Sequence, residues 1–318
     1  MAGIKAELRG YYFKNLNMGV IMTIPNNIPV IKKLRRVQRS EGRHWVGNGF
    51  PVQTLFSYPA SGEALSPFLL LDYAGPAEFP PTNKRLGVGE HPHRGFETVT
   101  VVYAGEVEHR DSSGGGGSIG PGDVQWMTAA SGVVHEEYHG RNFAQNGGLF
   151  EMVQLWVNLP AKDKMTSPRY QGILNSQIPV VTLPEGRGSV RVIAGEFAGV
   201  KGPAQTFTPI HLWDLRLTSL QPLELAVPEH YTVALVVLKG SIQMYGSESV
   251  LNSAEAGLFD RAGNVLRFDR ADNATVLLLC GEPIDEPIVG SGPFVMNTAE
   301  EIQQAISDYQ SGKMGHLS

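Results

Sequence analysis

The stretch VVYAG at residues 101–105 is matched 135 residues later by VVLKG at residues 236–240. A second turn signal keeps the same spacing, because Gly122 in the first copy corresponds to Gly257 in the second. Each copy is typical of a strand, a glycine turn, a second strand and another turn. A spacing that is kept across two separate turns predicts a duplicated β domain.

Length and composition agree with two β-rich domains. The chain has 318 residues, of which 37 are glycine and 21 are proline. The length fits about two domains of ~150 residues, and the excess of glycine and proline favours turn-rich β structure over a helical bundle. We therefore expect an all-β fold of sandwich or barrel domains. The strand-forming runs lie at residues 51–58, 97–103, 149–157, 189–194, 231–238 and 274–280.

The repeat and the turn signals divide the chain into three parts. We expect residues 1–28 to form an N-terminal extension. Residues 29–165 are expected to form the first β domain and residues 166–318 the second, which would carry a helix at its end.

That C-terminal helix is the strongest helical signal in the sequence. Thr298 followed by Glu301 is a capping box, which begins a helix, and Gly312 is the expected end. An apolar stripe at helical spacing predicts that the helix docks on the β core. The stripe consists of Ile302, Ala305, Ile306 and Tyr309.

Charge and cysteine content narrow the classes of function. The net charge is −5 and the sequence pI is about 6.0, which argues against a broadly basic nucleic-acid-binding protein. The cluster KKLRR at residues 32–36 is expected to be a solvated face, with a weak phosphate contact as the alternative.

Cys280 is the single cysteine and lies in an apolar run, so we expect a buried, inert thiol and a reducing compartment. No apolar run reaches the ~20 residues of a membrane span, and we expect a cytoplasmic protein.

Two histidine-containing motifs carry the chemistry. His91 and His93 are two residues apart, as are His135 and Glu137. Because side chains alternate along a strand, each pair points to one face. Two neighbouring strands would then present three imidazoles and one carboxylate to a common point. That donor set suits a divalent metal ion such as Fe, Mn, Co, Ni, Cu or Zn.

Other residues near these motifs leave alternatives open. Glu97 follows His93 by four residues and is either a rival ligand or a group that holds an imidazole N–H. His109 and His139 are expected to be surface residues or to support the ligands. The positions 135 residues after the four ligands hold no histidine, so we expect the second domain to lack the metal. These positions are Ala226, Pro228, Arg270 and Asp272.

At these motifs the sequence resembles the pirin family of the cupin superfamily. The resemblance covers roughly residues 30–313, and it departs from the family in the N-terminal extension and at Asn48, where the family often has Asp. The longest matching blocks are HPHRGFETV at 91–99 and PGDVQWMTA at 121–129. Shorter blocks are GNGFPV at 47–52, GVVHEE at 132–137, QLWVNL at 154–159, GEPIDEP at 281–287 and GPFVMNT at 292–298.

The resemblance implies a fold and a metal centre. It implies two cupin β-barrels, which are double-stranded β-helices, with one metal ion, usually iron, in the N-terminal barrel. The family's ligands fall on His91, His93, His135 and Glu137, which leaves Glu97 as a group that supports the ligands.

The resemblance also implies an activity. Pirin relatives include proteins similar to quercetin 2,3-dioxygenases, so we expect a metal-dependent dioxygenase that acts on a flavonol-like substrate with O₂ and releases carbon monoxide. Glu137 or Glu97 would take the substrate's hydroxyl proton, and Phe96, Trp126 and Met127 would line the pocket. The alternatives are a redox-responsive iron protein that acts through protein partners, and a metal that only stabilises the barrel.

Overall fold

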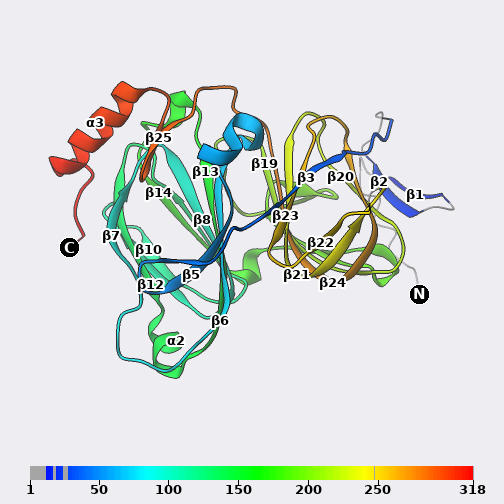
Figure 1. The fold of residues 1–318 in the computed structure, drawn as a ribbon, viewed down its shortest axis with the longest axis horizontal. Helices are drawn as coiled ribbons and strands as arrows, with labels where there is room; N and C mark the ends of the chain where they lie inside the picture. Colours follow the sequence, from blue (N-terminus) through cyan, green and yellow to red (C-terminus); the bar gives the residue numbers. More distant parts are fainter. Residues whose placement is uncertain (1–11, 17–18, 24–27, 247, 318) are drawn as a thin grey trace, which may run out of the picture. The chain divides into compact units, whose positions relative to one another are not determined.

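The computed structural model describes residues 12–16, 19–23, 28–246 and 248–317, and most of its regular structure is β-strand (Figure 1). The chain divides into two compact units. We call the unit of Ser40–Gln177 and Pro283–Ser318 the first barrel, and the unit of Met1–Arg39 and Ile178–Glu282 the second barrel. The expectation of an all-β protein with two domains is confirmed.

The first barrel is built from a larger and a smaller antiparallel sheet. The larger sheet has the strand order β14-β11-β8-β13-β6-β5-β4, and the smaller has the order β10-β9-β12-β7. An apolar cluster with members from both sheets includes Phe50, Val107 and Phe150. The strands of the larger sheet are β4 (His44–Val46), β5 (Phe50–Ser57), β6 (Phe68–Phe79), β8 (Phe96–Ala104), β11 (Val124–Thr128), β13 (Gly148–Asn158) and β14 (Arg169–Ile173). The strands of the smaller sheet are β7 (Gly87–His93), β9 (Val107–Asp111), β10 (Gly116–Ile119) and β12 (Val133–His139).

The remaining α-helices and strands of the first barrel lie outside these two sheets. A two-stranded ribbon is formed by β25 and β26 in the C-terminal segment. These elements are α1 (Tyr58–Ser61), α2 (Arg141–Asn146), β25 (Val289–Ser291), β26 (Phe294–Met296) and α3 (Ala299–Gln310).

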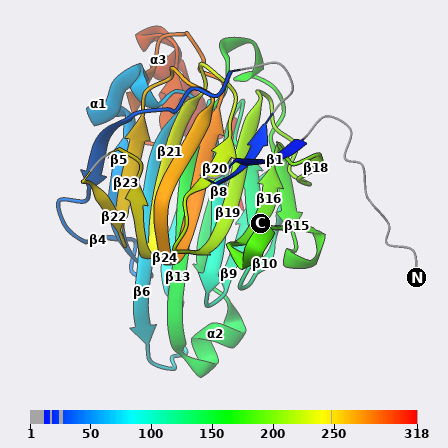
Figure 2. The same cartoon turned by 90° about the vertical axis from the view of Figure 1, so that its right-hand side faces the viewer.

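The second barrel has one branched sheet whose strands lie side by side in Figure 2, and a small ribbon of β17 and β18. Its core is apolar and includes Trp213, Leu215, Val237, Phe268 and Leu278, all nearly inaccessible to solvent. The strands are β1 (Tyr12–Leu16), β2 (Gly19–Thr23), β3 (Leu34–Arg39), β15 (Val180–Thr182), β16 (Gly188–Ala194), β17 (Glu196–Phe197), β18 (Val200–Lys201), β19 (Ile210–Ser219), β20 (Leu223–Ala226), β21 (Thr232–Met244), β22 (Val250–Asn252), β23 (Glu255–Phe259) and β24 (Val265–Gly281).

The unit boundaries differ from the expected ranges 29–165 and 166–318, because both terminal segments pack away from their sequence neighbours. Strand β3 pairs antiparallel with β23 of the second barrel. Residues 283–318 pack on the first barrel, where α3 and Met314 share an apolar cluster with Val134 of β12. Part of the expected extension 1–28, at 1–11, 17–18 and 24–27, lies outside the described residues.

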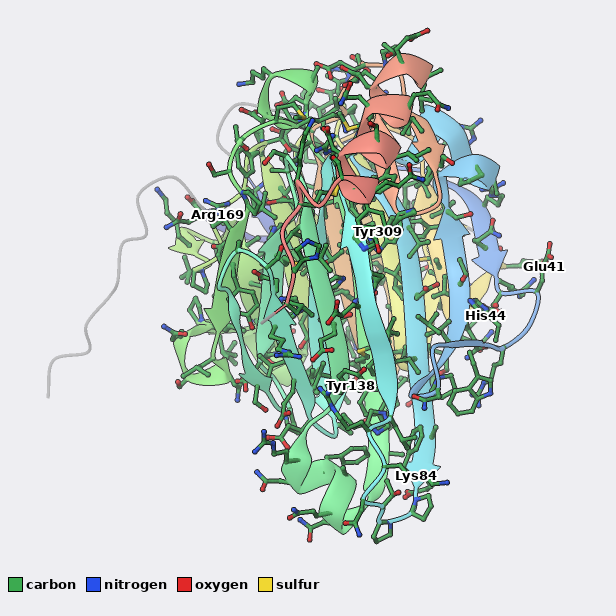
Figure 3. All side chains as sticks on the ribbon, turned by 90° about the vertical axis from the view of Figure 1, so that its left-hand side faces the viewer. Glu41, His44, Lys84, Tyr138, Arg169 and Tyr309 are labelled. Atoms are coloured by element: carbon green, nitrogen blue, oxygen red, sulfur yellow. The ribbon has the colours of Figure 1, made fainter. Side chains whose placement is uncertain are left out.

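The C-terminal helix begins as predicted. Thr298 accepts a hydrogen bond from the backbone N–H of Glu301, and the Glu301 side chain completes the capping box. Ile302 and Ala305 are buried against the first barrel, whereas Tyr309 is 40% exposed and its ring lies 6.4 Å from that of Phe294 (Figure 3). The stripe therefore docks on a β core, but on the core of the first barrel.

Lys32 does not lie on a solvated face as expected for the basic cluster. It is buried, and its Nζ donates hydrogen bonds to the backbone carbonyls of Tyr231, Asp260 and Arg261. Burial lowers the pKa of Lys32. Arg35 and Arg36 are exposed, so only part of the cluster faces solvent.

Cys280 is buried, as its apolar surroundings predicted. Burial raises the pKa of its thiol to about 12, which disfavours the reactive thiolate. Among the described residues, we find no helix with the length and hydropathy needed to cross a bilayer.

Lys164 links three parts of the first barrel. Its side chain is fully buried, and Nζ lies 2.7 Å from the Gly95 carbonyl, 2.7 Å from Asn158 Oδ1 and 3.0 Å from the Val295 carbonyl. Val295 belongs to the C-terminal segment, and Gly95 follows the HPH motif. Lys164 therefore ties the C-terminal segment to the loop beside the histidines.

We predict that Lys164→Met lowers the free energy of unfolding by about 3 kcal/mol, because it leaves buried carbonyl oxygens without donors. Urea denaturation of the variant measures the change. Lys162→Met is the matched control: the Lys162 side chain is 78% exposed, and its loss should change stability by less than about 0.5 kcal/mol. Equal stability of both variants and the parent protein would contradict the assigned role.

Candidate metal centre

The smaller sheet of the first barrel positions the candidate ligands. Strand β12 lies between β7 and β9. Its His135 is paired with His91 of β7 on one side and with Asp111 of β9 on the other. Glu137 is paired with His109 of β9. Because side chains alternate along each strand, these residues share one face of the sheet.

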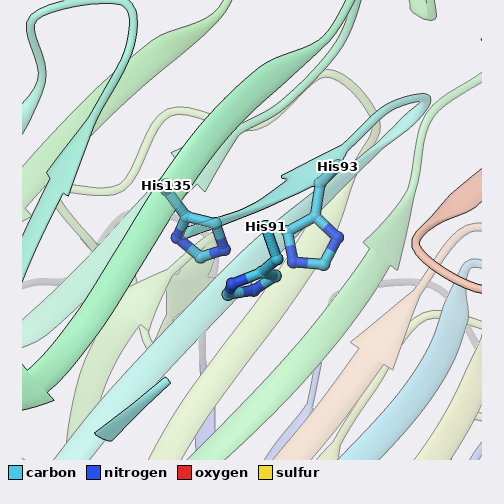
Figure 4. Close-up of side chains that lie close together, drawn as sticks. All are labelled: His91, His93 and His135. Atoms are coloured by element: carbon cyan, nitrogen blue, oxygen red, sulfur yellow. The ribbon is translucent and has the colours of Figure 1, made fainter. Parts of the chain in front are cut away.

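Three of the expected ligands form a cluster. Ligand nitrogens of His91, His93 and His135 lie within 4.8 Å of one another (Figure 4). The ring centroids are 4.2 Å apart for His91 and His135, and 4.9 Å apart for both other pairs. The alternation of side chains along β7 and β12 thus brings the two motifs together as predicted.

The environment keeps the buried imidazoles neutral. His93 and His135 are almost completely buried, and His91 is partly exposed. Burial, followed by the proximity of His91, holds the pKa of both His93 and His135 well below the usual 6.5. A neutral imidazole keeps one nitrogen lone pair, which is the form that binds metal ions.

Backbone carbonyls orient two of the rings. His91 Nδ1 lies 2.8 Å from the Gly89 carbonyl oxygen, and His93 Nδ1 lies 3.3 Å from that of Pro293. Since a carbonyl only accepts, each Nδ1 donates and each Nε2 keeps its lone pair. His135 Nε2 is buried and has no hydrogen-bond partner. Three imidazoles with these free nitrogens fit a divalent metal ion, which would satisfy the unpartnered atom.

Glu137 joins a second, overlapping cluster. Its ligand atoms lie within 4.8 Å of those of His135 and His109. Gln125 and Gln154, from the larger sheet, donate to its two carboxylate oxygens at 2.9 and 3.0 Å. The structure therefore places Glu137 beside His135, but not in the cluster that contains His91 and His93.

Glu97 lies in neither cluster. It is buried on β8, where Thr128 donates a hydrogen bond of 2.7 Å to its Oε1. Burial raises the pKa of Glu97 to about 7. The structure thus places this candidate catalytic residue outside both clusters, in a setting that favours its protonated form.

Comparisons with known proteins cover both barrels. The Pirin family model matches residues 49–157, and the Pirin C-terminal cupin domain model matches residues 212–315. The chain belongs to the pirin family. Residues 49–157 include all four of the expected ligands of this pirin, and the prediction of two cupin domains is confirmed.

Individual relatives extend this similarity to most of the chain. A Pseudomonas aeruginosa protein named "Putative quercetin 2,3-dioxygenase" is 54% identical over 283 residues, which is 89% of this chain and 98% of that protein. Pirin-1 of Arabidopsis thaliana is 37% identical over 92% of this chain and 98% of its own length. A crystal structure of quercetin 2,3-dioxygenase from Acinetobacter baumannii is 51% identical, covers 91% of this chain and 100% of its own, and has a TM-score of 0.87.

Sequence reasoning did not decide whether His109 of this pirin lies at the surface or supports the ligands. The structure excludes the surface position, because the His109 ring is buried and contacts His135 and Tyr170, with ring centroids 5.1 Å away in both cases. The sequence does contain a signal for His109: His109 and Asp111 are two residues apart, the same spacing as in the two motifs that identified the ligands. Gln125 and Gln154 carry no comparable signal, since they come from the facing sheet.

The other expected neighbours are buried. The Phe96 ring packs 5.1 Å from His93 and stacks 4.3 Å from Trp156. Trp126 and Met127 are buried in β11. His139 is not a surface residue: its ring lies 4.7 Å from that of Phe150, and its Nε2 is 2.9 Å from the Gly49 carbonyl oxygen.

We predict that His135→Ala weakens metal binding more than 100-fold, because loss of a residue that merely supports a ligand already costs about 10–100-fold. Metal per chain after dialysis, measured by mass spectrometry, checks this. His44→Ala is the control, since His44 is exposed on β4 (Figure 3) and lies in neither cluster. Full metal content in His135→Ala would show that the ligand assignment is wrong.

The raised pKa of Glu97 predicts a pH dependence of stability. Between pH 4.5 and about 7, unfolded Glu97 ionises while folded Glu97 keeps its proton. The free energy of unfolding should therefore fall as the pH rises through this window, by about 3 kcal/mol, and then level off. Metal-free Glu97→Gln should lack this fall in urea denaturation. Parallel pH curves for both proteins would contradict the prediction.

Proposed function

We propose that this pirin is a metal-dependent dioxygenase of the quercetin 2,3-dioxygenase type, which acts on a flavonol-like substrate and O₂. The observation that carries the proposal is the cluster of His91 with the buried His93 and His135, in which Nε2 of His135 has no partner. It is supported by relatives of this name that are 54% and 51% identical over most of the chain.

His91, His93 and His135 would hold the metal ion, and Glu137 would supply the carboxylate. We propose Fe(II), although the same donors also accept Mn, Co, Ni, Cu or Zn. A bound ion of this kind supplies a Lewis acid for the substrate's oxygens and a route for electrons between substrate and O₂. The residues around the ion would accept the substrate's proton, hold the proton acceptor in place and exclude water from the site.

Glu137 is the proposed acceptor of the substrate's hydroxyl proton. It lies next to His135, and the amides of Gln125 and Gln154 hold its two oxygens in place. Each oxygen still has a lone pair that can accept a proton. Glu97 is the alternative acceptor, because burial raises its pKa to about 7, close to the value that suits a general base.

The apolar wall beside the histidines would limit water. Phe96 is fully buried, and its ring packs against those of His93 and Trp156. A dry surrounding strengthens electrostatic interactions and protects reactive intermediates from hydrolysis. Phe96 would therefore favour O₂ chemistry over side reactions with water.

We predict that the iron-loaded protein consumes O₂ when quercetin is added, and releases one carbon monoxide per O₂. An oxygen electrode and carbon monoxide detection measure both. His135→Ala should lower the rate at least about 100-fold, because even a supporting residue of a metal site is worth 10–100-fold. His44→Ala should keep the rate.

Full iron occupancy without O₂ uptake would contradict the dioxygenase. That result would favour the alternative, a redox-responsive iron protein that acts through protein partners. A loss of thermal stability on iron removal, again without turnover, would instead favour a structural metal.

A further inference from the structure

Asp111 and His109 form a buried pair beside the proposed metal centre. His109 Nε2 lies 3.1 Å from Asp111 Oδ2, and both side chains are at most 1% exposed. The other oxygen of Asp111 accepts from the backbone N–H of Ser113 and Gly115 and from the Ser113 hydroxyl. Hydrogen bonds therefore hold both oxygens of the carboxylate in place, and Oδ2 faces His109.

The surroundings determine which nitrogen of His109 carries the proton. Asp111 accepts, so His109 Nε2 donates, and in the neutral imidazole His109 Nδ1 then keeps a lone pair. The contact on the opposite side of the His109 ring supports this tautomer, because Gln125 Nε2 lies 3.3 Å from His109 Nδ1. Gln125 presents its NH₂ group here, since its Oε1 accepts from the Tyr170 hydroxyl and its Nε2 donates to Glu137.

His109 in turn determines the tautomer of His135. The Nδ1 atoms of the two rings are 3.3 Å apart, a distance that is favourable only when one of them donates. His109 Nδ1 carries no proton, so His135 Nδ1 donates to it and shares the one lone pair of His109 Nδ1 with the Gln125 amide. The lone pair of His135 then lies on Nε2, the buried atom without a partner.

We propose that Asp111 and His109 are positioning residues, a hydrogen-bond relay that holds His135 in the tautomer whose Nε2 lone pair faces the metal. The role in metal binding rests on the metal centre of the proposed function. The tautomers themselves are a property of the metal-free chain.

Asp111→Asn should reverse the relay. The three donors from Ser113 and Gly115 require an acceptor, so the amide oxygen of Asn should stay with them and its NH₂ group should face His109. His109 Nε2 would then accept and Nδ1 would donate to His135 Nδ1, while the Gln125 amide would lose its acceptor on His109 and keep Glu137. The proton of His135 would move to Nε2 and block the atom that should bind the metal.

Two measurements test this. Long-range ¹H–¹⁵N NMR of metal-free protein labelled at histidine should show Nδ1–H on His135 and Nε2–H on His109, with both reversed in Asp111→Asn. Calorimetric titration with Co²⁺ alone should show about 10–100-fold weaker binding by Asp111→Asn. Ser113→Ala is the matched control: it removes one hydrogen bond to the other oxygen of Asp111 and should keep the tautomers and the Co²⁺ affinity.

Three results would overturn the relay. They are unchanged tautomers in Asp111→Asn, unchanged Co²⁺ affinity in that variant, and a loss of Co²⁺ binding in His109→Ala as complete as in His135→Ala, which would make His109 a ligand. Thermal unfolding of each variant confirms that it is folded. Failure of the parent protein to bind Co²⁺ would contradict the proposed function instead, and the tautomers would still be measurable.

Discussion

The interior of the first barrel depends on one constraint: a polar side chain that faces it must find its partner there, because water is excluded. The smaller sheet places its histidines on this inner face, where several of their nitrogens have a specific partner, whereas the buried Nε2 of His135 has none. The partners come from β7 itself through Gly89, from the neighbouring strand β9, from the larger sheet through Gln125, and from the C-terminal segment through Pro293. Among the histidine nitrogens of the described residues, the buried and unpartnered Nε2 of His135 therefore marks a place for an external ligand.

The second barrel is the other copy of the repeat, and its interior differs from that of the first barrel. Its core is apolar, with Trp213 and Phe268 among the largest side chains. At the positions that correspond to the second ligand motif it carries Arg270 and Asp272, whose side chains are more than half exposed. An apolar core stabilises the domain by excluding water from hydrocarbon surface and offers no donors to a metal ion.

The sequence predicts most of the local structure but not the long-range packing. Alternation along a strand was enough to place His91, His93 and His135 together, and the capping box located α3. The Pro293 carbonyl beside His93 is 200 residues away in sequence, so no local pattern reveals it. The same holds for Gln125 and for the packing of the C-terminal segment on the first barrel, which depend on how separate segments meet in the fold.

The central claim is that His91, His93 and His135 hold one metal ion inside the first barrel. An anomalous difference map from crystals of the metal-loaded protein, recorded at the absorption edge of the metal, tests it most directly. The account predicts one strong peak about 2.0–2.2 Å from the three Nε2 atoms. A peak that avoids these three nitrogens, or fully loaded crystals with no peak inside the first barrel, would contradict it.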